Sequence, residues 1–177
     1  MLNKIKNLIS QGTITRNELL KILQKEARKV DISDFIQCNL QIQQGVECIH
    51  TSYKKDCIKS YTNFMLRIKD VKVDDGNYNG QIDIDKLKEA VILLLKQEQK
   101  AKEEYDLKGA FWMIYKILSL YSTFIIEEPI HQVGFMFPGG FTVKIERDKF
   151  TCPVKENNKD NPSAVCPFCI AEQDENV

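Results

Sequence analysis

The sequence predicts a mainly α-helical protein, a multi-helix bundle with a small C-terminal β-hairpin and a cysteine-rich metal-binding segment. Three observations predict this fold class. Apolar residues recur every three or four positions through most of the first three-quarters of the 177 residues, which is the period of an amphipathic helix. Beyond Pro129 apolar and polar residues alternate, as in a half-buried strand, and three of the six cysteines follow. We therefore expect one domain over residues 1–177, with a helical part (1–128) and a hairpin with the cysteine cluster (129–177).

The first two helices are expected from apolar spacing and from capping residues. A short helix carries the apolar residues of segment 5–9 and ends near Gly12. Thr15 and Glu18 then have the spacing of a capping box, in which the hydroxyl and the carboxylate each satisfy a free amide at the start of a helix. We expect that second helix to continue to about residue 27.

Further helices are expected before Pro129. Ser33 or Asp34 is the expected cap of a third helix, and a fourth follows over residues 53–68. A fifth covers residues 87–104 after a polar, glycine-containing segment. The next spans residues 107–126 and is apolar on nearly every side, which is typical of the central element of a bundle.

The last quarter of the chain is expected to form a hairpin and a loop. Apolar residues occupy alternate positions in segment 141–145, Arg147 and Asp148 make a turn, and residues 150–152 return as a second strand. A polar loop follows, and residues 167–173 are expected to form a short turn or helix.

Composition disfavours several functional classes. Positive and negative charges balance at 25 each, and the isoelectric point is about 6.7. The chain therefore lacks the excess of basic residues that is typical of a nucleic-acid-binding protein. The longest apolar window, residues 111–126, is shorter than the ~20 residues of a membrane span and contains Lys116. Charged residues interrupt the N-terminus where a signal peptide would be apolar, so we expect a cytoplasmic protein whose cysteines are thiols or metal ligands.

Cys152, Cys166 and Cys169 are the residues most indicative of chemistry. They read C-x13-C-x2-C, and a Cys-x-x-Cys pair places two sulfurs on one tight turn, close enough to bind one tetrahedral metal ion. His131 precedes the hairpin and is the favoured fourth ligand, because one imidazole with three thiolates is a common zinc set. The sequence therefore predicts a zinc site made by these four residues.

Other ligand sets remain open. Cys48, Cys57 and His50 are rival fourth ligands, and a fourth thiolate would suit zinc or an iron–sulfur cluster equally. Cys166 and Cys169 also resemble a dithiol redox pair, although such pairs belong to a strand-to-helix junction of a βαβ fold. Finally, cysteines are often small buried hydrophobic residues, which is the interpretation preferred for Cys38, Cys48 and Cys57.

Two polar segments give weaker signals. Residues 75–83 resemble the start of an EF-hand loop, but the twelfth position is Lys86 where a bidentate carboxylate is needed, so a polar turn with Asp83 capping the next helix is favoured over a calcium site. Glu127 and Glu128 lie close to His131 in sequence and are candidates for a carboxylate that orients a metal-bound imidazole, or simply for a solvated helix end.

The C-terminal motifs resemble a known family. Segments 137–141 (FPGGF), 152–155 (CPVK), 160–164 (DNPSA) and 166–173 (CPFCIAEQ) together are similar to the C-terminal signature of an uncharacterised family found mainly in methanogenic archaea. The resemblance implies a cytoplasmic archaeal protein and supplies no catalytic residue. An anaerobic cytoplasm would also favour an oxygen-sensitive cluster.

The leading hypothesis is a helical protein with a structural zinc ion, whose helical face binds an unknown protein or small-molecule partner. We expect neither nucleic acid nor a membrane among its partners. The alternatives are an iron–sulfur or dithiol redox protein that uses Cys152, Cys166 and Cys169, and an interaction domain without a metal.

Overall fold

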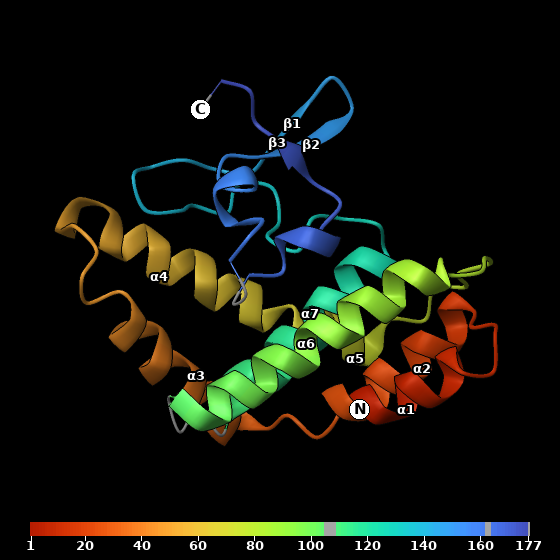
Figure 1. The fold of residues 1–177 in the computed structure, drawn as a ribbon. Helices are drawn as coiled ribbons and strands as arrows, with labels where there is room; N and C mark the ends of the chain where they lie inside the picture. The colour runs from red at the N-terminus through yellow and green to blue at the C-terminus, as the bar shows by residue number, and fades with distance from the viewer. Residues whose placement is uncertain (105–108, 162–163, 177) are drawn as a thin grey trace.

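The computed structural model is a bundle of helices with a small sheet at one end (Figure 1). It describes residues 1–104, 109–161 and 164–176. The helices are α1 (Leu2–Ile9), α2 (Arg16–Ala27), α3 (Ile32–Gly45), α4 (Thr51–Leu66), α5 (Ile68–Val73), α6 (Ile84–Glu104) and α7 (Ala110–Phe124). The other elements are the strands β1 (Lys144–Glu146), β2 (Lys149–Cys152) and β3 (Glu172–Gln173) and the 3₁₀ helices η1 (Glu156–Asn158) and η2 (Cys166–Phe168). The mainly helical fold class is confirmed, whereas the metal-binding segment stays a prediction.

Capping boxes set the start of two helices. Thr15 caps α2 as predicted: its hydroxyl accepts from the Glu18 amide at 3.2 Å, and the Glu18 carboxylate accepts from the Thr15 amide at 2.8 Å. For α3 the predicted cap, Ser33 or Asp34, is wrong. Asp31 is the cap, because its carboxylate accepts from the Ser33 and Asp34 amides while the Asp34 carboxylate accepts from the Asp31 amide.

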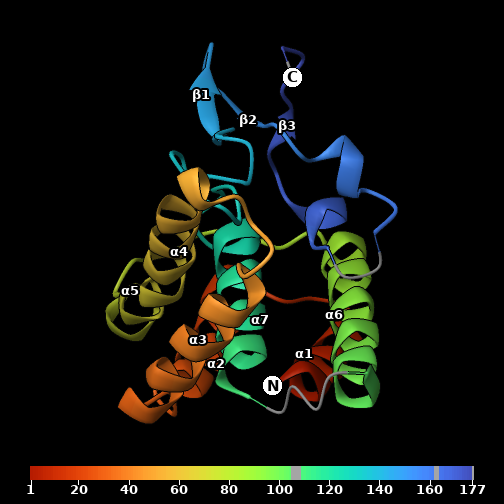
Figure 2. The same cartoon turned by 90° about the vertical axis from the view of Figure 1, so that its left-hand side faces the viewer.

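Helix α7 is the central element of the bundle, as its apolar sequence predicts. It packs against α2, α3, α4, α5 and α6 (Figure 2), and all of its residues from 117 to 124 are buried. Lys116 is the charged residue in its middle, and its ammonium pairs with the Glu98 carboxylate of α6 at 2.9 Å. The predicted start at residue 107 lies outside the described residues. Within those residues, no helix has the length and apolarity that a membrane crossing requires.

The predicted hairpin is confirmed, but its first strand covers residues 144–146 instead of 141–145, and all three of its residues are exposed. β1 and β2 pair antiparallel, with Lys144 opposite Thr151. Arg147 and Asp148 connect the strands with φ angles of 49° and 62°. Positive φ at both central residues defines the type I′ turn, whose twist matches that of the flanking strands.

The third strand was not predicted. The expected turn or short helix over residues 167–173 is correct only at its start, where η2 forms, whereas Glu172 and Gln173 pair in parallel with β2. Two residues are too few to give an alternating pattern, and this strand forms because β2 offers a free edge. The Asp174 amide extends the pairing by donating to the Cys152 carbonyl at 3.1 Å. The pairing holds the C-terminal cysteines beside the end of β2.

Candidate metal-binding site

The four predicted ligands line one small cavity. It lies between the segment after α7, the end of β2 and η2, and Cys152, Cys166, Cys169 and His131 all contribute to its wall. Its volume is about 10 Å³. A cavity of that size holds about one water-sized probe, so it suits a single ion and excludes a molecule.

The cysteines reach the cavity from two elements. Cys152 is the last residue of β2 and is buried, while Cys166 and Cys169 stand at the two ends of the η2 turn, closed by a hydrogen bond from the Cys169 amide to the Cys166 carbonyl at 3.3 Å. None of the three is in a disulfide. Burial, reinforced by the neighbouring thiols, raises the pKa of Cys166 to about 11, and burial also raises the pKa of Cys152. Both thiols are therefore protonated at neutral pH.

Lys155 supplies positive charge at the cavity wall. Its ammonium donates to the Cys169 carbonyl at 2.8 Å and to the Ala171 carbonyl, which fixes the chain on both sides of Ile170. The same ammonium acts to lower the pKa of Cys166, but burial outweighs it. Lys155 thus holds the C-terminal segment in place.

His131 is held by aromatic rings. Its imidazole centroid lies 4.4 Å from that of Phe135, 5.3 Å from that of Phe137 and 5.7 Å from that of Phe64. Burial, with a smaller contribution from the Arg67 guanidinium, lowers the pKa of His131 to about 4. The imidazole is therefore neutral at physiological pH, which is the state that binds a metal.

The rival ligands lie elsewhere. Cys48 is exposed in the connection between α3 and α4, and His50 caps α4, with its Nδ1 atom 2.7 Å from the Ser52 hydroxyl. Cys57 is buried in α4, and burial raises its pKa, as it does for Cys38 in α3. Neither these cysteines nor His50 lines the small cavity.

The four side chains face the same cavity without meeting at a common point. In the part of the chain that the structure describes, no three His, Cys, Asp or Glu side chains form a group spaced to hold a metal ion. Thiolates carry charge that only a cation compensates, so protonated thiols have no reason to converge to the ~2.3 Å metal–sulfur distance. The predicted ligand set stays a prediction.

The polar segment before α6 has structural roles. Asp83 caps α6 as expected, since its carboxylate accepts from the Lys86 amide at 3.1 Å. Asn77 accepts from the Asn17 side chain at 3.0 Å, and Asp74 accepts from two tyrosine hydroxyls. Within the predicted loop, Asn77 and Asp83 therefore use a side-chain oxygen in bonds that fix the loop and the start of α6.

Glu127 and Glu128 pair with arginines. Glu127 accepts a hydrogen bond from Arg16 at the start of α2, and Glu128 pairs with Arg67 at 3.1 Å. The sequence offered no signal for the first pair, whose members lie 111 positions apart.

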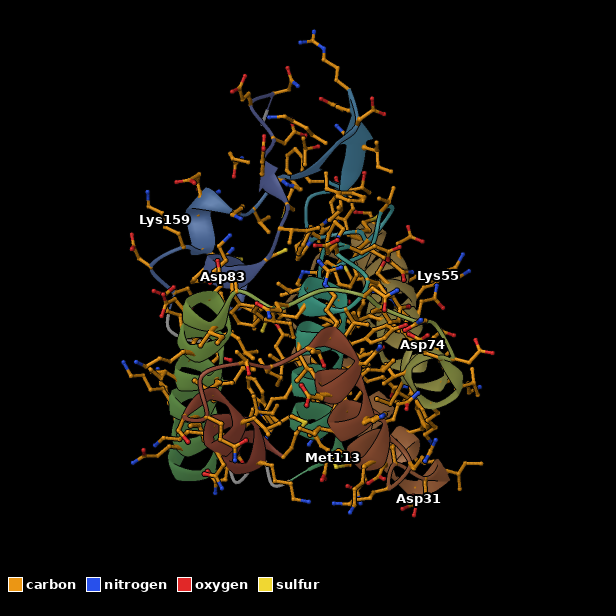
Figure 3. All side chains as sticks on the ribbon, turned by 90° about the vertical axis from the view of Figure 1, so that its right-hand side faces the viewer. Asp31, Lys55, Asp74, Asp83, Met113 and Lys159 are labelled. Atoms are coloured by element: carbon orange, nitrogen blue, oxygen red, sulfur yellow. The ribbon has the colours of Figure 1, made fainter. Side chains whose placement is uncertain are left out.

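A second, larger cavity was also missed by sequence analysis. Its volume is about 550 Å³, and it lies where the N-termini of α2 and α6 approach the end of α7 and η2. Figure 3 shows Asp83 at this end of α6, beside the C-terminal segment. A short backbone bridge holds the two N-termini together, with the Arg16 amide donating to the Gly80 carbonyl at 3.1 Å. Cys169 lines both cavities.

These features define a class of protein: a helical bundle whose end carries a small sheet and three cysteines with one histidine around a small cavity. The chain belongs to the family described as uncharacterized protein conserved in archaea (DUF2115), which matches residues 15–174. The resemblance drawn from the C-terminal motifs is therefore confirmed.

The chain is similar to proteins of methanogens. A UPF0305 protein of Methanothermobacter thermautotrophicus is 37% identical over 165 residues, which cover 93% of this chain and 99% of that protein. A second UPF0305 protein of that organism is 26% identical over 88% of this chain and 94% of its own length. A UPF0305 protein of Methanocaldococcus jannaschii is also 26% identical, over 88% of this chain and 94% of its own. No solved structure matches the chain significantly.

Proposed function

We propose that the protein binds one zinc ion through Cys152, Cys166, Cys169 and His131, and that the ion has a structural role. The observation that carries the proposal is that these four side chains line a single cavity with room for one ion. Three thiolates and one imidazole form a closed tetrahedral set, which leaves no open position for a substrate.

The imidazole is prepared for this role. His131 is neutral, and aromatic rings fix its plane, so binding costs little side-chain entropy. Its ring nitrogens accept or donate no hydrogen bond within the described part of the chain, so no protein partner competes with the metal.

The thiols would lose their protons when the ion binds. Burial makes an isolated thiolate unfavourable, and a bound zinc cation would offset this desolvation cost. Zinc binding would therefore release protons from the thiols, and the affinity for zinc would fall as the pH falls. Uptake also requires the Cys166–Cys169 turn to close on Cys152, within a segment that β3 and Lys155 already hold beside β2.

A structural role follows from the position of the cavity. The ion would tie the end of β2 and η2 to the segment that follows α7, and its binding free energy would add to the stability of the C-terminal region. We place this function in the cytoplasm, where reduced thiols persist, with an unknown protein or small-molecule partner for the rest of the molecule.

The second candidate is a redox protein that uses an iron–sulfur cluster or the Cys166–Cys169 dithiol. The raised pKa of Cys166 argues against a reactive dithiol, because such pairs work through a thiol whose pKa is lowered. A visible absorption band in anaerobically purified protein, bleached by a reductant, would favour a cluster and contradict the zinc proposal.

Elemental analysis of anaerobically purified protein tests the proposal. One zinc per chain is expected, with loss in Cys166→Ser and in His131→Phe, a variant that keeps an aromatic ring but has no nitrogen. Matched controls are Cys57→Ser and His50→Phe, which change the same residue types away from the cavity and should retain zinc. Zinc retained in His131→Phe but lost in Cys57→Ser would show that the fourth ligand is wrong.

A further inference from the structure

The larger cavity has the dimensions and lining of a small-molecule site. Its volume of about 550 Å³ falls in the ~300–1,000 Å³ range of ligand pockets. Its wall combines apolar side chains with a few charged ones, which is the composition that gives such pockets both affinity and orientation. It adjoins the proposed zinc site, with which it shares Cys169, but that smaller cavity has room only for an ion.

The charges on its wall are nearly balanced. Arg16 and Lys86 are positive, and Asp83, Glu89 and Glu127 are negative. Lys86 and Asp83 are exposed and lie 3.7 Å apart, so they neutralise each other near the rim. A ligand with several negative charges, such as a polyphosphate, would meet repulsion here.

Arg16 and Glu127 form an ion pair with unused hydrogen-bonding capacity. One guanidinium N–H of Arg16 donates to one carboxylate oxygen of Glu127. A guanidinium has five N–H donors and a carboxylate two acceptor oxygens, so both groups can bind a ligand without separating. The side chains are 25% and 60% exposed, which leaves both within reach of a molecule in the cavity.

The backbone of Glu127 is in a conformation that favours glycine. Its φ is 52°, and the amide of the next residue, Glu128, donates to the Ser122 carbonyl at 2.9 Å, which folds the chain back over the end of α7. A side chain at this position costs about 1 kcal/mol relative to glycine. A strained residue on a cavity wall is an indication of function, and here the strain places a carboxylate beside Arg16.

Aromatic side chains supply the apolar part of the wall. The rings of Phe124, at the end of α7, and Phe168, in η2, stack with centroids 6.4 Å apart and an interplanar angle of 18°. Both residues line the cavity, together with Ile82. They offer a surface on which an aliphatic or aromatic group can be buried.

We propose that this cavity binds a free α-amino acid with an apolar side chain. The ligand carboxylate would bind the Arg16 guanidinium, its ammonium group would bind the Glu127 carboxylate, and its side chain would pack against Phe124 and Phe168. An α-amino acid carries its ammonium and carboxylate groups on the same carbon atom, which matches the adjacent opposite charges of Arg16 and Glu127. A simple carboxylate or a simple amine would satisfy one member of the pair and face the like charge of the other.

Isothermal titration calorimetry with the full chain tests this proposal. L-phenylalanine and L-leucine are expected to bind with a Kd of about 1 mM or tighter, given the size of the ligands. N-acetyl-L-phenylalanine lacks the ammonium charge and L-phenylalanine amide lacks the carboxylate. Each should bind about 10- to 100-fold more weakly, because each loses one charge-assisted hydrogen-bonding group.

Variants assign the binding to this cavity. Arg16→Gln and Glu127→Gln should each weaken L-phenylalanine binding about 10- to 100-fold. The matched control is Glu128→Gln, which breaks the ion pair with Arg67 one residue away but does not line the cavity, and should bind as the wild type does. Circular dichroism of each variant verifies folding.

Three results would overturn the proposal. The first is no measurable binding of either amino acid at about 10 mM, tenfold above the expected limit. The second is equal affinity for the blocked and the free amino acids, which needs no variant and is therefore unaffected by any folding defect. The third is wild-type affinity in both Arg16→Gln and Glu127→Gln. Because the titrations follow the amino acid and not zinc, failure here leaves the zinc proposal standing.

Discussion

Replacing Tyr121 with Phe should destabilise the protein by removing a hydrogen bond to a charged group. The Tyr121 hydroxyl donates to the Asp74 carboxylate at 2.7 Å, and the Tyr121 side chain is buried in α7. A hydrogen bond to a charged group contributes about 1.5–3 kcal/mol, and because Asp74 keeps bonds from Tyr78 and the Gly76 amide we expect a loss of about 2 kcal/mol.

The pH dependence of that loss is a second, independent signature. Partial burial acts to raise the pKa of Asp74, but the hydrogen bonds from Tyr121, Gly76 and Tyr78 outweigh it and hold the pKa below its ordinary value. A carboxyl whose folded pKa is lowered contributes stability above its unfolded pKa of about 3.9, and that contribution is lost as the pH falls through the folded pKa. The difference between wild type and Tyr121→Phe should be constant from about pH 8 to pH 5 and shrink below about pH 4.

Urea unfolding followed by circular dichroism at several pH values measures both effects. Tyr61→Phe is the matched control, because the Tyr61 ring packs on Phe135 while its hydroxyl makes no hydrogen bond within the described part of the chain. Tyr61→Phe should lower the free energy of unfolding by less than about 1 kcal/mol. A Tyr121→Phe loss as small as that of the control, or one that is the same at pH 3 and pH 7, would refute the reasoning.

Other substitutions test the turns and caps. Glu127→Gly removes the strain of a side chain at positive φ after α7, so it should raise the free energy of unfolding by up to about 1 kcal/mol. Glu127→Ala keeps a side chain there and should not raise it. Equal urea midpoints for the two variants would count against backbone strain. Combining Arg147→Asn with Asp148→Gly suits the type I′ turn and should stabilise the hairpin by about 0.5–1 kcal/mol, seen as slower hydrogen exchange in β1 and β2; faster exchange would show a different turn. Asp31→Ala removes the N-cap of α3 and should lower the free energy of unfolding by about 1 kcal/mol, measured by thermal unfolding. An unchanged melting temperature would show that Asp31 does not stabilise the start of α3.

Local patterns predicted most of the fold. The apolar residues of α7 identify a buried central helix, the Thr15–Glu18 spacing identifies the start of α2, and Arg147 with Asp148 marks the hairpin turn. Each of these patterns involves residues that are close together in the sequence. Such features form from sequence-local energies, so a single chain is enough to find them.

The features that were missed depend on contacts between distant residues. Strand β3 is two residues long and exists because β2 has a free edge. The cap of α3 was misplaced because Asp31, Ser33 and Asp34 are all good capping residues, and only the observed hydrogen bonds distinguish them. A two-residue strand leaves no periodic pattern in the sequence, and several adjacent capping residues leave the start of a helix ambiguous. Both features are determined by tertiary contacts.

The candidate site illustrates the same limit. Spacing alone marked Cys166 and Cys169 as a pair, but the choice among His131, His50, Cys48 and Cys57 depended on which side chain the fold brings to the cavity. The structure brings His131 there. The larger cavity gave no sequence signal, because its ion pair joins residues at the start of α2 and the end of α7.

X-ray absorption at the zinc K-edge of anaerobically purified protein tests the central proposal most directly, because it counts the ligand atoms around the metal. The expected spectrum contains three sulfur ligands at about 2.3 Å and one nitrogen ligand at about 2.0 Å. Four sulfur ligands, a shell of oxygen and nitrogen only, or protein that neither retains zinc nor takes it up on reconstitution would contradict it.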